Sequence, residues 1–174
     1  MFARIKSSKT ARRAMTLAAA SLAMVGGSLV TAPTASAASF SGRFINVATD
    51  LCMDGSGNAG PGAAVIQWGC NGGANQRWYA STDSRGRQTI RNAASGLCLD
   101  RHDDTRMGAT LILWYCNDKW NQVFSFDPSW GPDDIRNDPS GHVIDVPGGT
   151  GVWGTQLIMW ENNGGSNQWW RLAQ

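Results

Sequence analysis

One acid, one indole and two amides recur three times along the chain, always in the same order. The three sets are Asp54, Trp68, Asn71 and Asn75; Asp100, Trp114, Asn117 and Asn121; and Asp145, Trp160, Asn163 and Asn167. A carboxylate accepts strong hydrogen bonds, an amide donates and accepts them, and an indole offers a broad apolar face. Such a set suits a ligand with hydroxyl groups on its edges and C–H groups on its faces, which is the chemistry of a sugar.

Each set belongs to a longer segment that is itself repeated. A tryptophan recurs every 46 residues, at Trp68, Trp114 and Trp160. A glutamine recurs with the same period, at Gln76, Gln122 and Gln168. A fixed period of this length indicates one supersecondary unit used three times, over about 42–82, 86–127 and 131–173. The glutamines are expected to support the three sets from behind rather than to contact a ligand.

The first 37 residues differ from the repeats and have the features of a secretory signal. A basic segment without acids is followed by the apolar stretch 16–30 and by Ala35-Ser36-Ala37, a small-residue cleavage site. We therefore expect cleavage before Ala38 and a secreted, extracellular domain of residues 38–174. A membrane anchor is the alternative, but the apolar stretch is short and is interrupted by two glycines. An arginine pair in the basic segment leaves twin-arginine export open.

Removal of the signal changes the charge of the chain. The full sequence has 15 Lys and Arg against 13 Asp and Glu, and five of the basic residues lie in the signal. The mature domain therefore has a net charge of about −3, which offers no basic surface to nucleic acid. After the signal, no segment is apolar enough to span a membrane. The repeats fill a length typical of one domain, so no separate catalytic domain and no enzyme activity are expected.

Four cysteines in an exported chain predict disulfides, and four cysteines allow three pairings. The repeat distinguishes among them, because each of its first two copies contains a cysteine pair separated by 18 residues. In the third copy the equivalent positions are Val143 and Asn162, so both partners are missing together. The predicted disulfides are therefore Cys52–Cys70 and Cys98–Cys116. A metal site is not expected, since the chain has no C-x-x-C motif and only two histidines.

Two further motifs were weighed and rejected. The segment Gly55–Gly60 matches the dinucleotide-binding pattern G-x-G-x-x-G, but that site requires a helix to follow, and Pro61-Gly62 with a strand pattern follows instead. No nucleophile elbow is present, and neither histidine recurs among the repeats. The sequence therefore predicts no cofactor and no catalytic residues.

The local pattern predicts an all-β fold. Segments such as 44–47, 89–91 and 111–115 are short, rich in β-branched, Leu or aromatic residues, and bounded by Gly, Asn, Asp or Pro. Each copy has room for four such strands. Three copies of four strands favour a pseudo-threefold, closed six-stranded barrel with a hairpin cap, because closure removes the free edges of short strands.

With these residues in place, the chain resembles the ricin B-type β-trefoil lectin family, whose members also occur as carbohydrate-binding modules. The family signature Q-x-W matches Gln76-Arg77-Trp78 and Gln168-Trp169-Trp170, and it is altered to Gln122-Val123-Phe124 in the middle copy. The resemblance covers essentially the whole mature chain. It implies a β-trefoil in which each repeat carries one shallow sugar pocket formed by its acid, indole and two amides, while Trp78, Phe124 and Trp170 fill the barrel core.

Each role has a simpler alternative. The three aspartates could bind only turn amides. Trp68 lies two residues from Cys70, so strand alternation places them on one face, which is also compatible with core packing. Some family members have a glutamine two residues before the stacking aromatic, whereas this chain has isoleucine there in all three copies. The third copy has one more residue between its acid and its indole; Trp153 in that loop either extends the third pocket or caps the barrel.

The sequence thus predicts a secreted carbohydrate-binding protein with up to three weak pockets. Galactose-, xylose- or mannose-type glycans are the candidate partners, and three pockets on one body would bind polysaccharide or clustered glycans by avidity. A protein-binding trefoil, such as a secreted protease inhibitor, is the alternative. Repetition favours the sugar, because an inhibitor needs one loop, whereas three pockets explain why the acid and amides occur three times.

Overall fold

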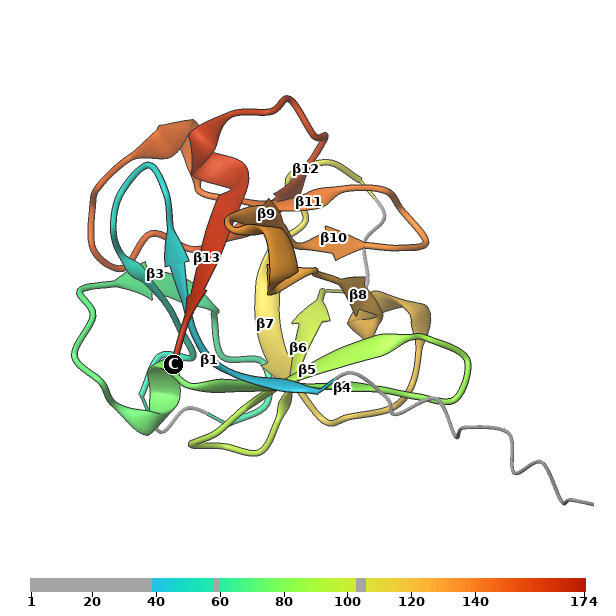
Figure 1. Cartoon of the computed structure of the whole chain (residues 1–174). Helices are drawn as coiled ribbons and strands as arrows, with labels where there is room; N and C mark the ends of the chain where they lie inside the picture. The colour runs from blue at the N-terminus through green and yellow to red at the C-terminus, as the bar shows by residue number, and fades with distance from the viewer. Residues whose placement is uncertain (1–38, 58–59, 103–105) are drawn as a thin grey trace, which may run out of the picture. The chain divides into compact units, whose positions relative to one another are not determined.

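The computed structural model describes residues 39–57, 60–102 and 106–174, so the expected signal 1–37 lies outside the described residues. Throughout the described part, short antiparallel strands alternate with loops and single turns of 3-10 helix, as the all-β prediction requires (Figure 1). None of the helices there is long and apolar enough to cross a membrane.

The strands of the described residues are two to seven residues long. They are β1 (Phe40–Asn46), β2 (Cys52–Asp54), β3 (Ile66–Trp68), β4 (Trp78–Thr82), β5 (Gln88–Asn92), β6 (Cys98–Arg101), β7 (Leu111–Trp114), β8 (Phe124–Ser125), β9 (Asp133–Asp134), β10 (Arg136–Asn137), β11 (Val143–Asp145), β12 (Ile158–Trp160) and β13 (Trp169–Ala173). The 3-10 turns are η1 (Ala74–Gln76), η2 (Trp120–Gln122), η3 (Pro128–Trp130), η4 (Pro147–Gly149) and η5 (Ser166–Gln168).

The hairpin of β4 and β5 illustrates how the sequence forms these strands. Trp78 and Ala80 are buried while Tyr79 and Ser81 are exposed, which is the alternation of a strand with one face on the core. Asp83 closes the turn, since its carboxylate accepts the N–H groups of the two arginines that follow at 2.8 and 2.9 Å. These hydrogen bonds hold the pKa of the Asp83 carboxyl below its usual value.

Six strand positions form a closed barrel. β1 pairs with β4, β4 with β5, β5 with β8, and β8 with β10; β9 pairs with β13, which returns to β1. β9 and β10 are separated only by Ile135, which is fully buried, so together they act as one interrupted strand. Figure 1 shows β1 beside both β4 and β13. The predicted six-stranded barrel is confirmed.

Three hairpins, β2–β3, β6–β7 and β11–β12, form the cap. Their neighbouring segments are joined head to tail: the N–H of Val65 donates to the carbonyl of Leu111 at 3.0 Å, Leu111 to Leu157 at 3.0 Å, and Leu157 back to Val65 at 2.9 Å. All three side chains are fully buried. This ring of hydrogen bonds lies around the pseudo-threefold axis that the 46-residue period predicts.

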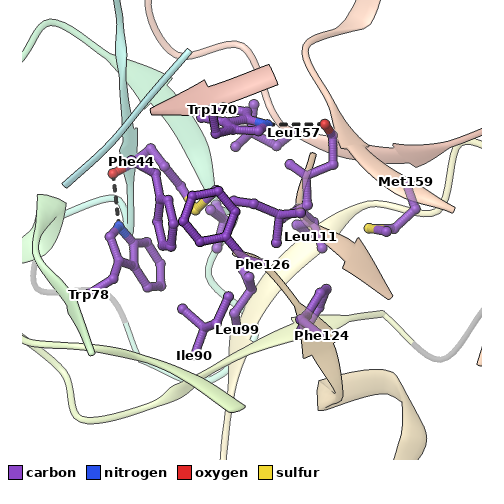
Figure 2. Close-up of a cluster of buried hydrophobic side chains, with 14 of the residues drawn as sticks. Phe44, Trp78, Ile90, Leu99, Leu111, Phe124, Phe126, Leu157, Met159 and Trp170 are labelled. Carbon is purple, nitrogen blue, oxygen red and sulfur yellow. Dashed lines mark hydrogen bonds between the residues drawn. The ribbon is translucent and has the colours of Figure 1, made fainter. Parts of the chain in front are cut away.

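The core fills the barrel with large side chains from all three repeats (Figure 2). Trp78, Phe124 and Trp170 occupy equivalent positions and are fully buried, as the sequence predicts. The two buried indoles keep their polar groups satisfied, because Trp78 Nε1–H donates to the carbonyl of Met53 at 3.1 Å and Trp170 Nε1–H to that of Ile144 at 3.2 Å. These contacts hold the barrel strands against the cap strands that carry the site.

Both predicted disulfides are present. Cys52–Cys70 and Cys98–Cys116 each join the first strand of a cap hairpin to the segment just after the second strand. In the third repeat, Val143 is fully buried and Asn162 donates its side-chain N–H to Asp134 Oδ2 at 2.5 Å. Asn162 thus bonds to β9 and not to the strand that a third crosslink would reach.

Candidate functional site

The three aspartates lie at or next to the end of the first strand of each cap hairpin. Asp54, Asp100 and Asp145 lie on β2, β6 and β11, each paired with the isoleucine of the facing strand. Their exposed fractions are 3%, 2% and 4%. A buried carboxylate requires hydrogen-bond donors, so these acids depend on the groups that surround them.

A short 3-10 turn supplies those donors in the first repeat. Asn75 and Gln76 are consecutive residues of η1, and their side-chain amides donate to the Asp54 carboxylate, each at 2.8 Å. Gln76 also donates to the carbonyl of Gly69 at 2.9 Å and accepts the N–H of Asn71 at 2.8 Å. One fully buried glutamine therefore joins the acid, the loop and the second amide, as its predicted supporting role requires.

The other two repeats form the same network. Gln122 donates to Asp100 at 2.6 Å and Gln168 to Asp145 at 2.8 Å. Each glutamine also donates to the carbonyl of the residue after the indole and accepts a backbone N–H from the asparagine next along the loop. Asn121 and Asn167 donate to the acids of their repeats at 2.8 and 2.9 Å.

Each predicted set lines one pocket. Asp54, Trp68, Asn71 and Asn75 line a pocket of about 220 Å³. Asp100, Trp114, Asn117 and Asn121 line one of about 110 Å³. Asp145, Trp160, Asn163 and Asn167 line one of about 680 Å³. The structure therefore brings together all twelve residues that the sequence selects, four in each pocket.

Two of the three indoles, Trp68 and Trp114, lie at the surface, whereas Trp160 is half-buried. Trp68 and Trp114 are 38% and 40% exposed, so the core-packing alternative is wrong for both. Each indole is supported by a turn of a neighbouring repeat: a Cβ placed on Gly154 would lie 3.5 Å from the Trp68 ring, and one on Gly62 would lie 3.7 Å from the Trp114 ring. Both glycines have positive φ, a conformation that other residues rarely adopt. The sequence analysis did not use these glycines, although they recur with the 46-residue period.

The turn alternative for the aspartates is correct in part. Asp54 Oδ1 accepts the backbone N–H of Ser56 at 2.7 Å, which is the turn contact, while the same carboxylate lines the pocket. In the second pocket, the Oδ1 atom of Asn121 is buried and has no hydrogen-bond partner among the residues that the structure describes. A buried acceptor of this kind is expected to bind a donor such as a hydroxyl group.

Burial affects the ionisation of Asp145, the acid of the third pocket. Desolvation raises the pKa of the Asp145 carboxyl, and hydrogen bonds from Gln168 and Asn167 oppose that rise.

Among residues 39–57, 60–102 and 106–174, no group of three His, Cys, Asp or Glu side chains could hold a metal ion. The pockets therefore present a carboxylate, amides and an indole as their chemistry.

Trp153 is not where the sequence analysis placed it. It neither extends the third pocket nor caps the barrel; it lies against Trp68 of the first repeat, with ring centroids 5.3 Å apart. The loop between η4 and β12 reaches the first repeat because the three cap hairpins are arranged as a ring. The contact joins residues 85 positions apart, so local spacing could not indicate it.

The chain matches the ricin-type β-trefoil lectin domain over residues 40–172, and it belongs to that family. ThreeFoil, a designed threefold-symmetric protein, is 28% identical with a TM-score of 0.72, over 77% of this chain and 98% of ThreeFoil. An exo-β-1,3-galactanase from Clostridium thermocellum is 29% identical with a TM-score of 0.68, over 76% of this chain but only 30% of the galactanase.

A ricin B-like lectin from Macrolepiota procera, solved in complex with lactose, shares the fold. It is 20% identical with a TM-score of 0.65, over 78% of this chain and 95% of that lectin. No curated protein sequence matches the chain. The predicted β-trefoil of the ricin B type is thereby confirmed, and it is a lectin domain.

Proposed function

We propose that this protein is a secreted, non-enzymatic lectin that binds polysaccharide or clustered glycans through three weak pockets. The observation that carries the proposal is the triplication of one arrangement. In each repeat a buried aspartate, held by a glutamine and an asparagine, lies in one pocket with an indole. A structural role in the cap would not require Trp68 and Trp114 to be exposed.

The geometry suggests how each pocket holds one sugar. The carboxylate accepts hydrogen bonds from hydroxyl groups, and the amides fix the remaining hydroxyls. The indole covers the C–H face of the ring. Since the glutamine network fixes acid and amides before binding, little conformational entropy is lost there. The affinity of one open pocket remains low, and three on a rigid body increase it through effective concentration.

Galactose-, xylose- and mannose-type glycans remain the candidate ligands. The similarity to part of an exo-β-1,3-galactanase makes β-1,3-galactan the first polysaccharide to test. Secretion is supported by the signal features of residues 1–37 and by two disulfides, which persist in oxidising surroundings.

The test compares oxidised residues 38–174 with a variant carrying Asp54→Ala, Asp100→Ala and Asp145→Ala, on a glycan array and by pull-down with insoluble polysaccharides. We expect the wild type to bind and the folded triple variant to lose at least about tenfold in affinity, because each pocket loses its charged acceptor. Trp68→Ala/Trp114→Ala/Trp160→Ala serves as a second triple variant, since these side chains are more exposed than the aspartates and can be removed with less effect on stability. Binding retained in both triple variants would disprove the site assignment. A folded wild type that binds no glycan would favour a protein-binding trefoil, to be tested next against proteases.

A further inference from the structure

Two exposed tryptophans from different repeats lie side by side at the first pocket. Trp68 ends β3, and Trp153 belongs to the loop between η4 and β12. Their ring planes are inclined by 51° with centroids 5.3 Å apart, and the side chains are 38% and 58% exposed. Large apolar side chains exposed together usually mark a place where a ligand or partner binds.

A buried amide holds the loop of Trp153 on the first repeat. Gln67, fully buried on β3, donates from Nε2 to the carbonyls of Thr150 and Val152 at 2.5 and 3.0 Å. Backbone hydrogen bonds of 2.9 Å join the same residue to Gly154 and Thr155. Trp153 is therefore positioned before any ligand arrives, which reduces the entropy lost on binding.

Two departures from the repeat make this arrangement specific to the first pocket. The position of Gln67 is occupied by Leu113 and Met159 in the other copies, both apolar and fully buried. The residue after Trp68 is Gly69, where the other copies have larger side chains. A Cβ at Gly69 would lie 2.6 Å from the Trp153 ring, so the indole fits only against glycine. The amide and the glycine thus both serve to place one exposed side chain.

We propose that Trp68 and Trp153 are consecutive stacking positions, so that the first pocket binds two adjacent sugar units of one glycan chain; this rests on the lectin function proposed above. Asp54, Asn71 and Asn75 bind the hydroxyls of the unit that stacks on Trp68. The neighbouring unit stacks on Trp153.

The inclination of the two rings supports a chain over a single sugar. The C–H face of one pyranose chair can lie parallel to only one of two ring planes inclined by 51°. Two units joined by a glycosidic bond can stack on both planes, because their faces can rotate relative to each other. The third repeat therefore helps to determine the specificity of the first pocket, which favours oligosaccharides or polysaccharides over terminal single sugars.

The experiment isolates the first pocket in a Trp114→Ala/Trp160→Ala background, which removes the other two stacking indoles. Binding is measured by calorimetry with galactose, xylose and mannose and with β-1,3-galactotriose, xylotriose and mannotriose. We expect the trisaccharide of the recognised series to bind about two- to tenfold more tightly than its monosaccharide, as one added stacking contact provides. Trp153→Ala should abolish this preference, so that the trisaccharide and its monosaccharide bind with similar affinity.

A second pair of variants tests whether the position of the Trp153 indole matters, and not only its presence. Gly69→Ala keeps Trp153 but displaces it, and should weaken the trisaccharide in the same way. Gly151→Ala is the matched control, since it lies in the same loop with no atom within 4 Å of an added Cβ, and should change nothing. An unchanged trisaccharide preference in Trp153→Ala would overturn the inference while leaving the lectin function intact. Absence of glycan binding by the wild type would instead overturn the lectin function itself.

Discussion

The first and third repeats hold the same four pocket side chains, but only the first has a disulfide beside them. Cys52–Cys70 joins β2 to the segment after β3. At the equivalent positions, the third repeat has buried Val143 and an Asn162 that donates to Asp134. The glutamine network is nevertheless closely similar, with a glutamine-to-carboxylate distance of 2.8 Å in both repeats.

This comparison shows that different features set the stability of a repeat and the positions of its pocket side chains. Because the acid, glutamine and asparagine keep their contacts without a crosslink, the network itself must set the positions of the pocket groups. The disulfide instead restricts the unfolded chain, which raises the stability of the repeat without changing the pocket. The third pocket is also larger, about 680 against 220 Å³, and η4 of its longer loop lines it.

The largest expected effect is on stability. Replacement of either cysteine pair, as Cys52→Ser/Cys70→Ser or Cys98→Ser/Cys116→Ser, should lower the free energy of unfolding by about 3 kcal/mol. The two values should be similar, because both disulfides join cysteines separated by 18 residues. Urea unfolding of the purified variants measures this. Sugar affinity of the folded variants should stay the same. A loss below about 1 kcal/mol would show that the crosslinks do not limit the unfolded state.

A second test breaks the network in the repeat with a disulfide and in the repeat without one. Gln76→Ala and Gln168→Ala should each lower the free energy of unfolding by about 2–3 kcal/mol, because a buried carboxylate, a carbonyl and an N–H lose their partner. Thermal unfolding at fixed pH is the measurement. Gln156→Ala, which removes a single hydrogen bond, should lower it by about 1 kcal/mol or less. A much smaller loss in Gln76→Ala would mean that the disulfide also maintains the geometry.

The comparison can be sharpened by adding the missing crosslink. Val143→Cys/Asn162→Cys places cysteines at the positions that are bonded in the other two repeats, and should raise the free energy of unfolding by about 1–2 kcal/mol. Engineered disulfides often yield less than the chain-entropy value, and the bond from Asn162 to Asp134 is lost. Urea unfolding under oxidising and reducing conditions measures the gain, and the reduced protein is its own control. No gain on oxidation would contradict the equivalence of the positions.

The smallest effect concerns pH and the third pocket. Burial raises the pKa of Asp145, so this acid becomes protonated at a higher pH than an ordinary aspartate. As pH falls through that raised pKa, the third pocket loses its ionised acceptor, and sugar affinity should fall about fivefold. Calorimetry with the Trp68→Ala/Trp114→Ala variant measures this pocket alone.

The same shift acts in the opposite direction on stability. The folded state binds the proton of Asp145 more tightly than the unfolded state does, so its contribution to stability increases as pH falls from the folded pKa to the unfolded value. Asp145→Asn should remove both trends. A binding profile that is equally pH-dependent in Asp145→Asn would assign the effect to another group.

The repeat period predicts much of the molecule, because equivalent positions in three copies must occupy equivalent places. The closed barrel, both disulfides and the three pocket sets follow from it. The position of Trp153 does not follow from the period. It depends on the circular arrangement of the three cap hairpins, which brings the third repeat against the first. The glycines that support the neighbouring indoles, Gly62, Gly108 and Gly154, recur with the period and could have been found from the sequence. Gln67 differs from the residues at its equivalent positions, so the repeat gives no indication of its role.

The hydrogen-bond ring of Val65, Leu111 and Leu157 also bears on when the domain can fold. Each repeat depends on both of the others, and Asn46 donates to the carbonyl of Asn167 across 121 residues. Contacts between such distant residues are slow to form, because long loops must close first. The barrel thus stays open until β13 has been synthesised and reaches β1. Until then β1 lacks its β13 partner, so one edge of the sheet stays unpaired on the growing polypeptide.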